Sequence, residues 1–320
     1  MSSPLAKRQR TEDASTTRSS VWYKDGSIIL QAADTQFRVH WGVPSQHSSF
    51  FRDLEDLPQP PDQPAVDGCV IVELQDSAVD VEHLLKALYD PTFLSQTALP
   101  LAVVGALIRL GHKYDFKNLL DSAVARLTSQ NPATLEEFDA LFVIKSKPTP
   151  IIIYPGYSLG MLALAREKNI GLALPFAFYL ASGGNMEQFL QAVRRKDEAI
   201  PSLSLDDICR CFIGRQRLVT KQFQPGYTLG WLREWPHPPA DCNNPAKCTA
   251  KRKSKFHSYM DANCVQPFLE GSQADIWKGR FCAACYEHII KSVTAGRKKM
   301  WEELLVIFDL PPWDQLKNDL

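Results

Sequence analysis

The feature that most constrains the fold is a pair of short apolar runs near the N-terminus, at residues 28–30 (Ile-Ile-Leu) and 37–40 (Phe-Arg-Val-His). Residues 33–36 (Ala-Asp-Thr-Gln) lie between the runs and form a polar turn segment. Two apolar runs on either side of such a turn predict a β-hairpin. A Ser-rich connection then leads to a helix start at Phe50, and a helix in that position can cover one face of the hairpin.

Further elements follow from periodicity and from the residues that begin or end them. A β-branched run at residues 69–74 predicts a buried strand, after a proline-rich loop at 58–68. Helical spacing of leucine, valine and phenylalanine predicts helices at residues 77–89, 101–110 and 116–127. Ser77 is expected to cap the first of these helices, and Gly111 is expected to end the second.

Taken in order, the pieces of residues 21–130 resemble a BTB/POZ domain. The pieces that carry the resemblance are Asp25-Gly26-Ser27, Phe37-Arg38-Val39-His40, Ser48-Ser49-Phe50-Phe51 and residues 70–74, 84–89 and 107–114. They match a hairpin, a strand ending in Val-His, a helical pair, a strand, a helix ending in Tyr and a closing helix pair. The arrangement is also similar to the BTB proteins common in mushroom-forming fungi, in which a cysteine-containing helical region follows.

The resemblance implies an interaction module without catalysis. The partners that it implies are a second copy of the chain, another BTB protein, a cullin-type ubiquitin ligase scaffold or a transcriptional co-regulator. Residues 41–44 (Trp-Gly-Val-Pro) depart from the basic and leucine-rich residues usual after the Val-His pair. Pro44 is expected to shorten or distort the helix there, which lies near the dimer face in relatives.

The composition is that of an ordinary globular protein, with 45% hydrophobic residues, 22% charged residues and a formal net charge of zero over 320 residues. Zero net charge argues against nucleic-acid binding through overall charge, which needs a basic surface. No apolar run approaches the ~20 residues of a membrane helix, and residues 1–20 lack the apolar core of a secretory signal. An intracellular location, in nucleus or cytoplasm, is therefore expected, where cysteines are free thiols or metal ligands.

The expected fold class is α+β, with a mainly α-helical C-terminal region. Shifts of composition and periodicity divide the chain into a disordered tail at 1–20, the BTB-like domain at 21–130, a helical extension at 131–235 and a cysteine-containing helical region at 236–320. The tail carries Lys7, Arg8 and Arg10, which are typical either of a nuclear import signal or of a solvated tail.

Residues 156–160 (Gly-Tyr-Ser-Leu-Gly) fit the G-x-S-x-G pattern of a serine hydrolase and follow a strand-like apolar run. Asp206 or Asp207 and His237 come later in the order that a catalytic triad requires. The alternative is that Ser158 only caps a helix. No strands that would build the surrounding parallel sheet are predicted, so the hydrolase is a remote alternative and no enzyme is expected.

Four cysteines form the second chemical pattern of the chain. Cys242 and Cys248 form a C-x5-C pair in a Pro/Asn-rich loop, and Cys282 and Cys285 form a C-x2-C pair at the start of a helix predicted over 283–308. A tetrahedral structural zinc ion requires four such soft ligands, and a helix N-terminus favours thiolates. The sequence therefore predicts zinc, with small buried hydrophobic residues as the alternative. Substitute ligands would be Cys264, His257 and His288.

A basic run lies between the two cysteine pairs. It is typical either of a phosphate-contacting patch or of a solvated loop, and it consists of Lys247, Lys251, Arg252, Lys253 and Lys255. The function that the sequence predicts is protein–protein interaction, through self-association or recruitment of a partner. The competing hypothesis is a zinc-stabilised nuclear nucleic-acid-binding protein.

Overall fold

The computed structural model describes residues 16–58, 64–143, 149–194, 203–233, 239–262, 265, 268 and 275–320. The chain forms two compact units. One, called the sheet unit below, is Met1–Gln96 with Gly105–Ala123, and the other, called the helical unit, is Thr97–Val104 with Val124–Leu320. The division passes between Gln96 and Thr97 and then within two helices, between residues 104 and 105 and between residues 123 and 124. The domain boundary near residue 130 stays a prediction.

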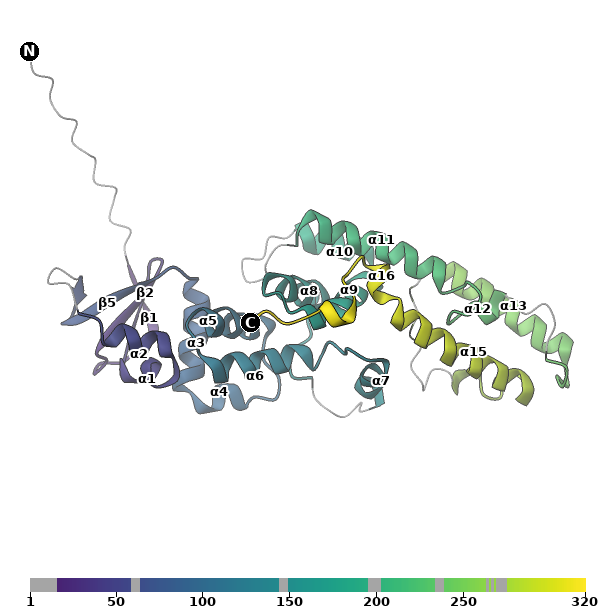
Figure 1. The fold of residues 1–320 in the computed structure, drawn as a ribbon, viewed down its shortest axis with the longest axis horizontal. Helices are drawn as coiled ribbons and strands as arrows, with labels where there is room; N and C mark the ends of the chain where they lie inside the picture. Colours follow the sequence, from purple (N-terminus) through teal and green to yellow (C-terminus); the bar gives the residue numbers. More distant parts are fainter. Residues whose placement is uncertain are drawn as a thin grey trace, which may run out of the picture. The chain divides into compact units, whose positions relative to one another are not determined.

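The sheet unit contains a five-stranded sheet with the strand order β1-β3-β2-β5-β4. The strands are β1 (Thr17–Trp22), β2 (Ile28–Ala32), β3 (Thr35–Val39), β4 (Ala65–Val66) and β5 (Cys69–Leu74) (Figure 1). β2 and β3 form the predicted hairpin, with Ile28 opposite Val39 and Leu30 opposite Phe37. β5 runs parallel to β2 over the predicted range. The α+β class expected from the sequence is confirmed.

β1, the first strand along the chain, forms one edge of the sheet beside β3. It runs parallel to β3, with Thr17 opposite Thr35, so it begins inside the tail predicted at residues 1–20. Its sequence, TRSSVW, has no alternation of apolar and polar residues, and four of its six residues are polar. β1 is a strand because its backbone pairs with β3, and such pairing leaves no pattern in the side chains. The sequence therefore does not predict this strand. Residues 1–15, with the basic stretch of the tail, lie outside the described part of the chain.

Helices complete the sheet unit. They are α1 (Gly42–His47), α2 (Ser49–Glu55), α3 (Ala78–Tyr89), α4 (Pro91–Ser95) and the greater part of α5 (Leu101–Lys113) and of α6 (Lys117–Thr128), which belong to this unit from Gly105 and up to Ala123. α3 packs against β1 and β2 and buries Val81, Leu84 and Leu85. Ser48 caps α2, because its hydroxyl accepts a hydrogen bond of 3.1 Å from the Phe51 amide. Pro44 is tolerated in the short α1 because it lies in the first turn, where no intrahelical donor is lost.

The sequence predicts that Gly111 ends a helix. This prediction is wrong, because α5 continues to Lys113. A Cβ atom at Gly111 would lie 3.1 Å from the Cβ atom of Leu120. The glycine therefore allows α5 and α6 to approach closely, and its role is packing rather than termination.

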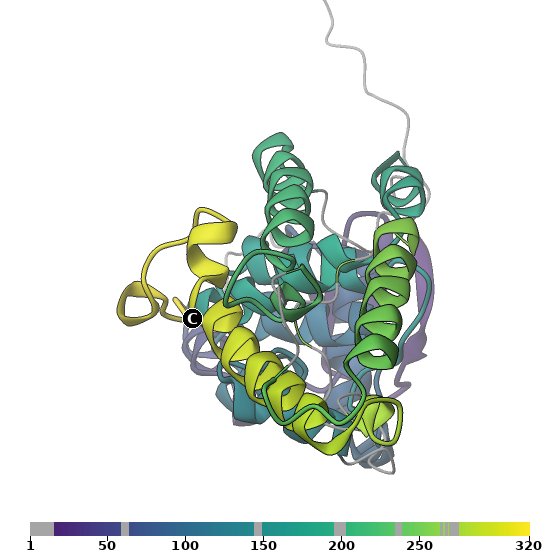
Figure 2. The same ribbon diagram turned by 90° about the vertical axis from the view of Figure 1, so that its right-hand side faces the viewer.

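The helical unit is built from α7 (Leu135–Val143), α8 (Tyr157–Glu167), α9 (Leu174–Gly183), α10 (Met186–Arg194), α11 (Leu205–Lys221), α12 (Gly230–Arg233), α13 (Pro245–Ala262), α15 (Ala283–Glu302) and α16 (Leu304–Ile307). Three short 3-10 helices lie at Gly171–Ala173, Asp275–Trp277 and Trp313–Gln315. α8 and α11 pack against α9, and α12 packs against α13 and α15, the green and yellow-green helices in the foreground of Figure 2. The helix predicted over 283–308 divides at Glu303 into α15 and α16.

α13 is the largest departure from what the sequence predicts, which is a Pro/Asn-rich loop around Cys242 and Cys248, followed by a basic run with a solvated loop as one of its interpretations. The Asn244 side chain accepts a hydrogen bond of 3.1 Å from the Lys247 amide and so begins the helix. Pro245 occupies the first helical position, where a proline is favourable. The basic residues that follow are good helix formers, so the proline and asparagine residues mark a helix start rather than a loop.

No helix in the described residues combines the length and the apolar character needed to cross a membrane.

Candidate metal centre

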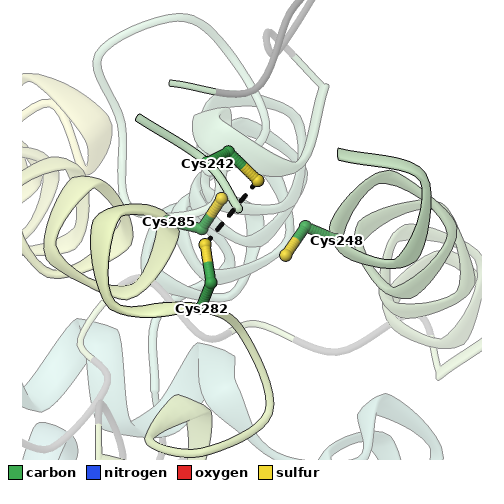
Figure 3. Close-up of side chains that lie close together, drawn as sticks. All are labelled: Cys242, Cys248, Cys282 and Cys285. Atoms are coloured by element: carbon green, nitrogen blue, oxygen red, sulfur yellow. Dashed lines mark hydrogen bonds between the residues drawn. The ribbon is translucent and has the colours of Figure 1, made fainter. Parts of the chain in front are cut away.

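Four cysteine side chains of the helical unit converge at one point, although they come from three segments of the chain, the turn before α13, the start of α13 and the start of α15. The sulfur atoms of Cys242, Cys248, Cys282 and Cys285 all lie within 4.8 Å of one another. The Sγ atoms of Cys282 and Cys242 are 3.6 Å apart and form a hydrogen bond, drawn as the dashed line in Figure 3. All four are free thiols, since a disulfide would need sulfur atoms about 2.05 Å apart. The structure therefore brings together the four residues that the sequence predicts as one ligand set.

Two helix starts position these side chains. Cys282 is the N-cap residue of α15, and Cys285 lies in the first turn of that helix. Cys248 lies in the first turn of α13, and its amide donates to the Asn244 carbonyl. Cys242 precedes α13 in a turn closed by its own amide and the Pro239 carbonyl. Figure 3 shows the three segments presenting their sulfur atoms toward a common centre.

Burial and backbone donors act differently on the individual thiols. Backbone hydrogen bonding from the Cys285 amide lowers the pKa of Cys282 to about 7, and the Asn243 amide contributes in the same direction. Burial raises the pKa of Cys285, and burial also raises the pKa of Cys242. The Cys282 sulfur therefore forms a thiolate more readily near neutral pH than the Cys242 and Cys285 sulfurs do.

The geometry fits a tetrahedral zinc ion. With zinc–sulfur bonds of about 2.3 Å, the sulfur atoms of a regular tetrahedron are about 3.8 Å apart. The observed separations, 3.6 Å for Cys282 to Cys242 and at most 4.8 Å elsewhere, require only small side-chain adjustments. Four thiolates leave no open coordination position, which is the donor set of a structural and not a catalytic site.

The cluster adjoins the apolar core of the surrounding helices. Cys248 and Cys285 are buried there, with a group of buried aromatic and aliphatic residues that includes Phe223, Leu229, Trp231, Leu232, Trp277, Phe281, Ile289 and Val293. The residues come from the segment between α11 and α12, from α12, α13 and α15, and from the segment 275–281 before α15. A metal ion at the cysteines would join the starts of α13 and α15 at the edge of this core.

The substitute ligands considered from the sequence take no part in the cluster. His257 and His288 are exposed and are not in the group of residues that could hold a metal ion. Cys264 lies outside the described residues. The Cys285 amide is the helix N-terminus donor that the sequence predicts, but it lowers the pKa of Cys282 alone, since burial raises the pKa of Cys285. The Asn243 amide has no residue signature and could not be predicted.

The G-x-S-x-G stretch has a structural setting of its own. Gly156 occupies the N-cap position of α8 with a φ of 97°, so Ser158 lies within the first turn and does not cap the helix. Asp207 forms an ion pair of 2.8 Å with Arg166, and His237 lies outside the described residues. Among the described residues of the helical unit, strand pairing is limited to two isolated bridges, Leu99–Ile151 and Ile170–Asn318.

The basic run does not present a continuous charged face. Lys251 donates to the Arg280 carbonyl, and Arg252 donates to the Leu232 carbonyl. The Lys255 ammonium group lies 5.7 Å from the centre of the Trp277 ring. Lys247 and Lys253 are exposed. Three of the five basic side chains are therefore used inside the helical unit, which reduces the phosphate contacts that the run could supply to a nucleic acid.

No protein-family model matches the chain, and no curated protein matches it at the significance required.

Proposed function

We propose that the chain is a non-catalytic protein-interaction adaptor, with a BTB/POZ-type sheet unit and a zinc-stabilised helical unit. The observation that carries the proposal is the order of elements in the sheet unit. The hairpin β2–β3, the helices α1 and α2, the strand β5, the helix α3 and the helices α5 and α6 follow one another as the resemblance to BTB domains implies. The sheet unit acts through self-association or through a protein partner, for which a cullin-type scaffold and a transcriptional co-regulator are the candidates.

The proposed zinc ion has a structural role in this adaptor. Its support is the convergence of four cysteines at tetrahedral spacing beside the buried core of the helical unit. The zinc holds the helical unit in one conformation, so that its surface can be recognised by a partner. Binding free energies of about 10–16 kcal/mol for structural zinc in small modules are enough to decide whether such a unit folds.

The first experiment measures association of the purified full chain. Light scattering after size-exclusion chromatography gives the mass over a wide range of concentration. Isotope-mixed cross-linking with mass spectrometry then identifies which residues join two different copies. We expect a dimer or larger assembly with inter-chain cross-links in residues 16–55 or in α3, α5 and α6.

A partner other than a second copy is sought by affinity purification of the tagged full chain, followed by cross-linking of the retained proteins. The proposal requires at least one retained protein whose cross-links map to the sheet unit. A chain that is monomeric at every concentration and retains no cross-linked protein would contradict the interaction function. Labelling of Ser158 by a fluorophosphonate probe would instead favour the hydrolase.

Elemental analysis of protein purified without added metal tests the zinc. We expect about one zinc ion per chain, as four-cysteine sites hold a single ion. Protein that contains no zinc, and in which all four thiols react with a thiol reagent in the native state, would contradict the metal site.

A further inference from the structure

A cavity of about 360 Å³ lies beside α12 and α13 in the helical unit. Its lining residues are Leu232, Arg233, Arg252, Lys253, Phe256 and His257. Three of the six side chains are cationic, one is a histidine, and the other two are apolar. The cavity is therefore a place where positive charge gathers around a small volume, apart from the cysteine cluster.

Helix geometry explains why these side chains meet. Residues 252 and 256 are one turn apart on α13, and residues 253 and 257 are another such pair beside them, so all four share a side of the helix. Lys251 and Lys255 lie on the neighbouring side and turn to the Arg280 carbonyl and the Trp277 ring. The basic run of the sequence is thus divided between an internal face and a face that lines the cavity.

Arg252 is held in place by the protein itself. Its guanidinium group donates to the Leu232 carbonyl in α12, and no other hydrogen bond of this group is found among the described residues. Burial without a carboxylate partner lowers the pKa of this arginine from its ordinary value. Phe256 packs edge-to-face on Phe223, with ring centres 5.8 Å apart, and so forms a fixed apolar wall.

The positive charges of the cavity are not compensated within the described structure. None of the lining residues is acidic. In the part of the chain that the structure describes, Arg233, Arg252 and Lys253 form no ion pair with a carboxylate. Like charges brought together at a partly enclosed site repel one another, and an anion bound among them removes that repulsion. Guanidinium groups bind phosphoryl oxygens with paired, charge-assisted hydrogen bonds.

We propose that this cavity binds the phosphoryl group of a phosphorylated peptide segment in a partner protein. The inference rests on the proposed interaction function and names the chemistry of the partner. A single compact cavity suits one phosphoryl group, whereas a nucleic acid would use several phosphate contacts along a stripe. Lys251 and Lys255, which could extend such a stripe, are engaged elsewhere. Phe256 offers an apolar surface to the peptide residue beside the phosphorylated one.

The probe is a fluorescein-labelled pool of short peptides with phosphoserine or phosphothreonine at a fixed central position and mixed residues around it. Its unphosphorylated counterpart and a mixed-sequence single-stranded DNA of similar charge are measured beside it, by anisotropy with the purified full chain at physiological salt. We expect the phosphorylated pool to bind at least about tenfold more tightly than either of the others, a difference of about 1.4 kcal/mol. Inorganic phosphate is expected to compete with it.

Charge-neutralising variants test the location. Arg233→Gln with Lys253→Gln is expected to weaken binding of the phosphorylated pool at least about tenfold, since two charge-assisted hydrogen bonds to the phosphoryl group are lost. Both residues are exposed, so the variant should keep the zinc content and circular dichroism of the wild type. Lys247→Gln, an exposed lysine of the same helix outside the cavity, is the matched control and should bind as the wild type does.

Three results would overturn the proposal. They are equal binding of the two peptide pools, equal or tighter binding of the DNA, and equal loss of binding in the Lys247→Gln control. A chain that associates through its sheet unit but ignores the phosphorylated pool refutes this site and leaves the proposed function standing. A chain that binds the pool through Arg233 and Lys253, yet neither self-associates nor retains a partner, contradicts the proposed function alone.

Discussion

Glycines of the helical unit differ in whether the surrounding structure has room for a side chain. A Cβ atom at Gly296, in the middle of α15, would overlap the backbone of Tyr227 and Thr228. A Cβ atom at Gly183, the last residue of α9, would meet nothing within 4 Å. At one position the glycine is required by a helix–backbone contact, while at the other it only lowers helix propensity.

Gly296→Ala should therefore destabilise the protein by about 1–3 kcal/mol or more, because a rigid backbone must move to accept the methyl group. Gly183→Ala is the matched control, and its free energy of unfolding should stay within about 1 kcal/mol of the wild type. Chemical denaturation followed by circular dichroism compares the two. Equal effects of both substitutions would show that the close approach at Gly296 does not constrain the fold.

His83, on α3 of the sheet unit, links stability to pH. Burial lowers its pKa below the ordinary value of 6.5, with a smaller opposing effect of Asp80, and its Nδ1 atom has no hydrogen-bond partner in the described structure. The unfolded chain takes up a proton near pH 6.5, whereas the folded chain does so only at lower pH. The unfolded state thus binds more protons as the pH falls through 6.5, so acidification reduces the free energy of unfolding.

The expected result is a thermal unfolding midpoint that falls between about pH 7.5 and about pH 5.5, partly because of His83. His83→Gln cannot titrate, so the variant should show a shallower dependence over the same interval. An unchanged pH profile in the variant would mean that His83 does not carry this linkage. Exposed His47→Gln serves as the control and should keep the wild-type profile.

At the scale of elements, side-chain patterns predict some parts of this fold and leave others invisible. α3 repeats its apolar residues with the period of a helix because it buries one face, and β2, β3 and β5 are short segments that contain β-branched or aromatic residues. β1 is mostly polar and is held by backbone pairing, so its sequence contains no such signal. α13 has little apolar periodicity and many basic residues. Its sequence therefore does not predict a helix and is also typical of a solvated loop.

The cysteine cluster was predictable for a chemical reason and not a geometric one. Paired cysteines are typical of metal ligands whatever element carries them, so the four candidate ligands followed from residue type and spacing. The supporting element did not follow, because Cys248 lies on a helix and not in a loop. The sequence shows the basic run of α13 but not the cavity. The cavity also needs Arg233, which comes from α12, a separate four-residue helix.

Replacement of one ligand tests the element-scale role of the cysteines. Cys242→Ser should lower the zinc content from about one ion per chain to well below that value and lower the unfolding temperature, because serine is a poor zinc ligand. Cys242 is only partly buried, so the loss of packing is small. Cys209→Ser, at an exposed cysteine of α11, is the control and should retain zinc. Equal zinc contents in both variants would exclude Cys242 as a ligand.

At the scale of the whole molecule, the two units should respond differently to removal of the metal. The four cysteines of the cluster lie within the helical unit, and no described residue of the sheet unit belongs to it. Treatment with a chelator should increase hydrogen exchange in α13 and α15, whereas β2, β3 and β5 should keep their protection. Mass spectrometry of peptic fragments resolves the segments. Uniform loss of protection, or none in α13 and α15, would contradict a zinc ion that stabilises only the helical unit.

The distance along the chain between the cysteine pairs has a consequence for how the helical unit folds. Cys242 and Cys282 are 40 residues apart, so bringing them together closes a long loop. For a flexible chain, the length-dependent part of that closure costs about 3 kcal/mol of entropy. The proposed zinc ion would act as a reversible cross-link, excluding open conformations of the loop only while it is bound. Refolding of this unit should therefore be faster when zinc is present from the start than when it is added afterwards.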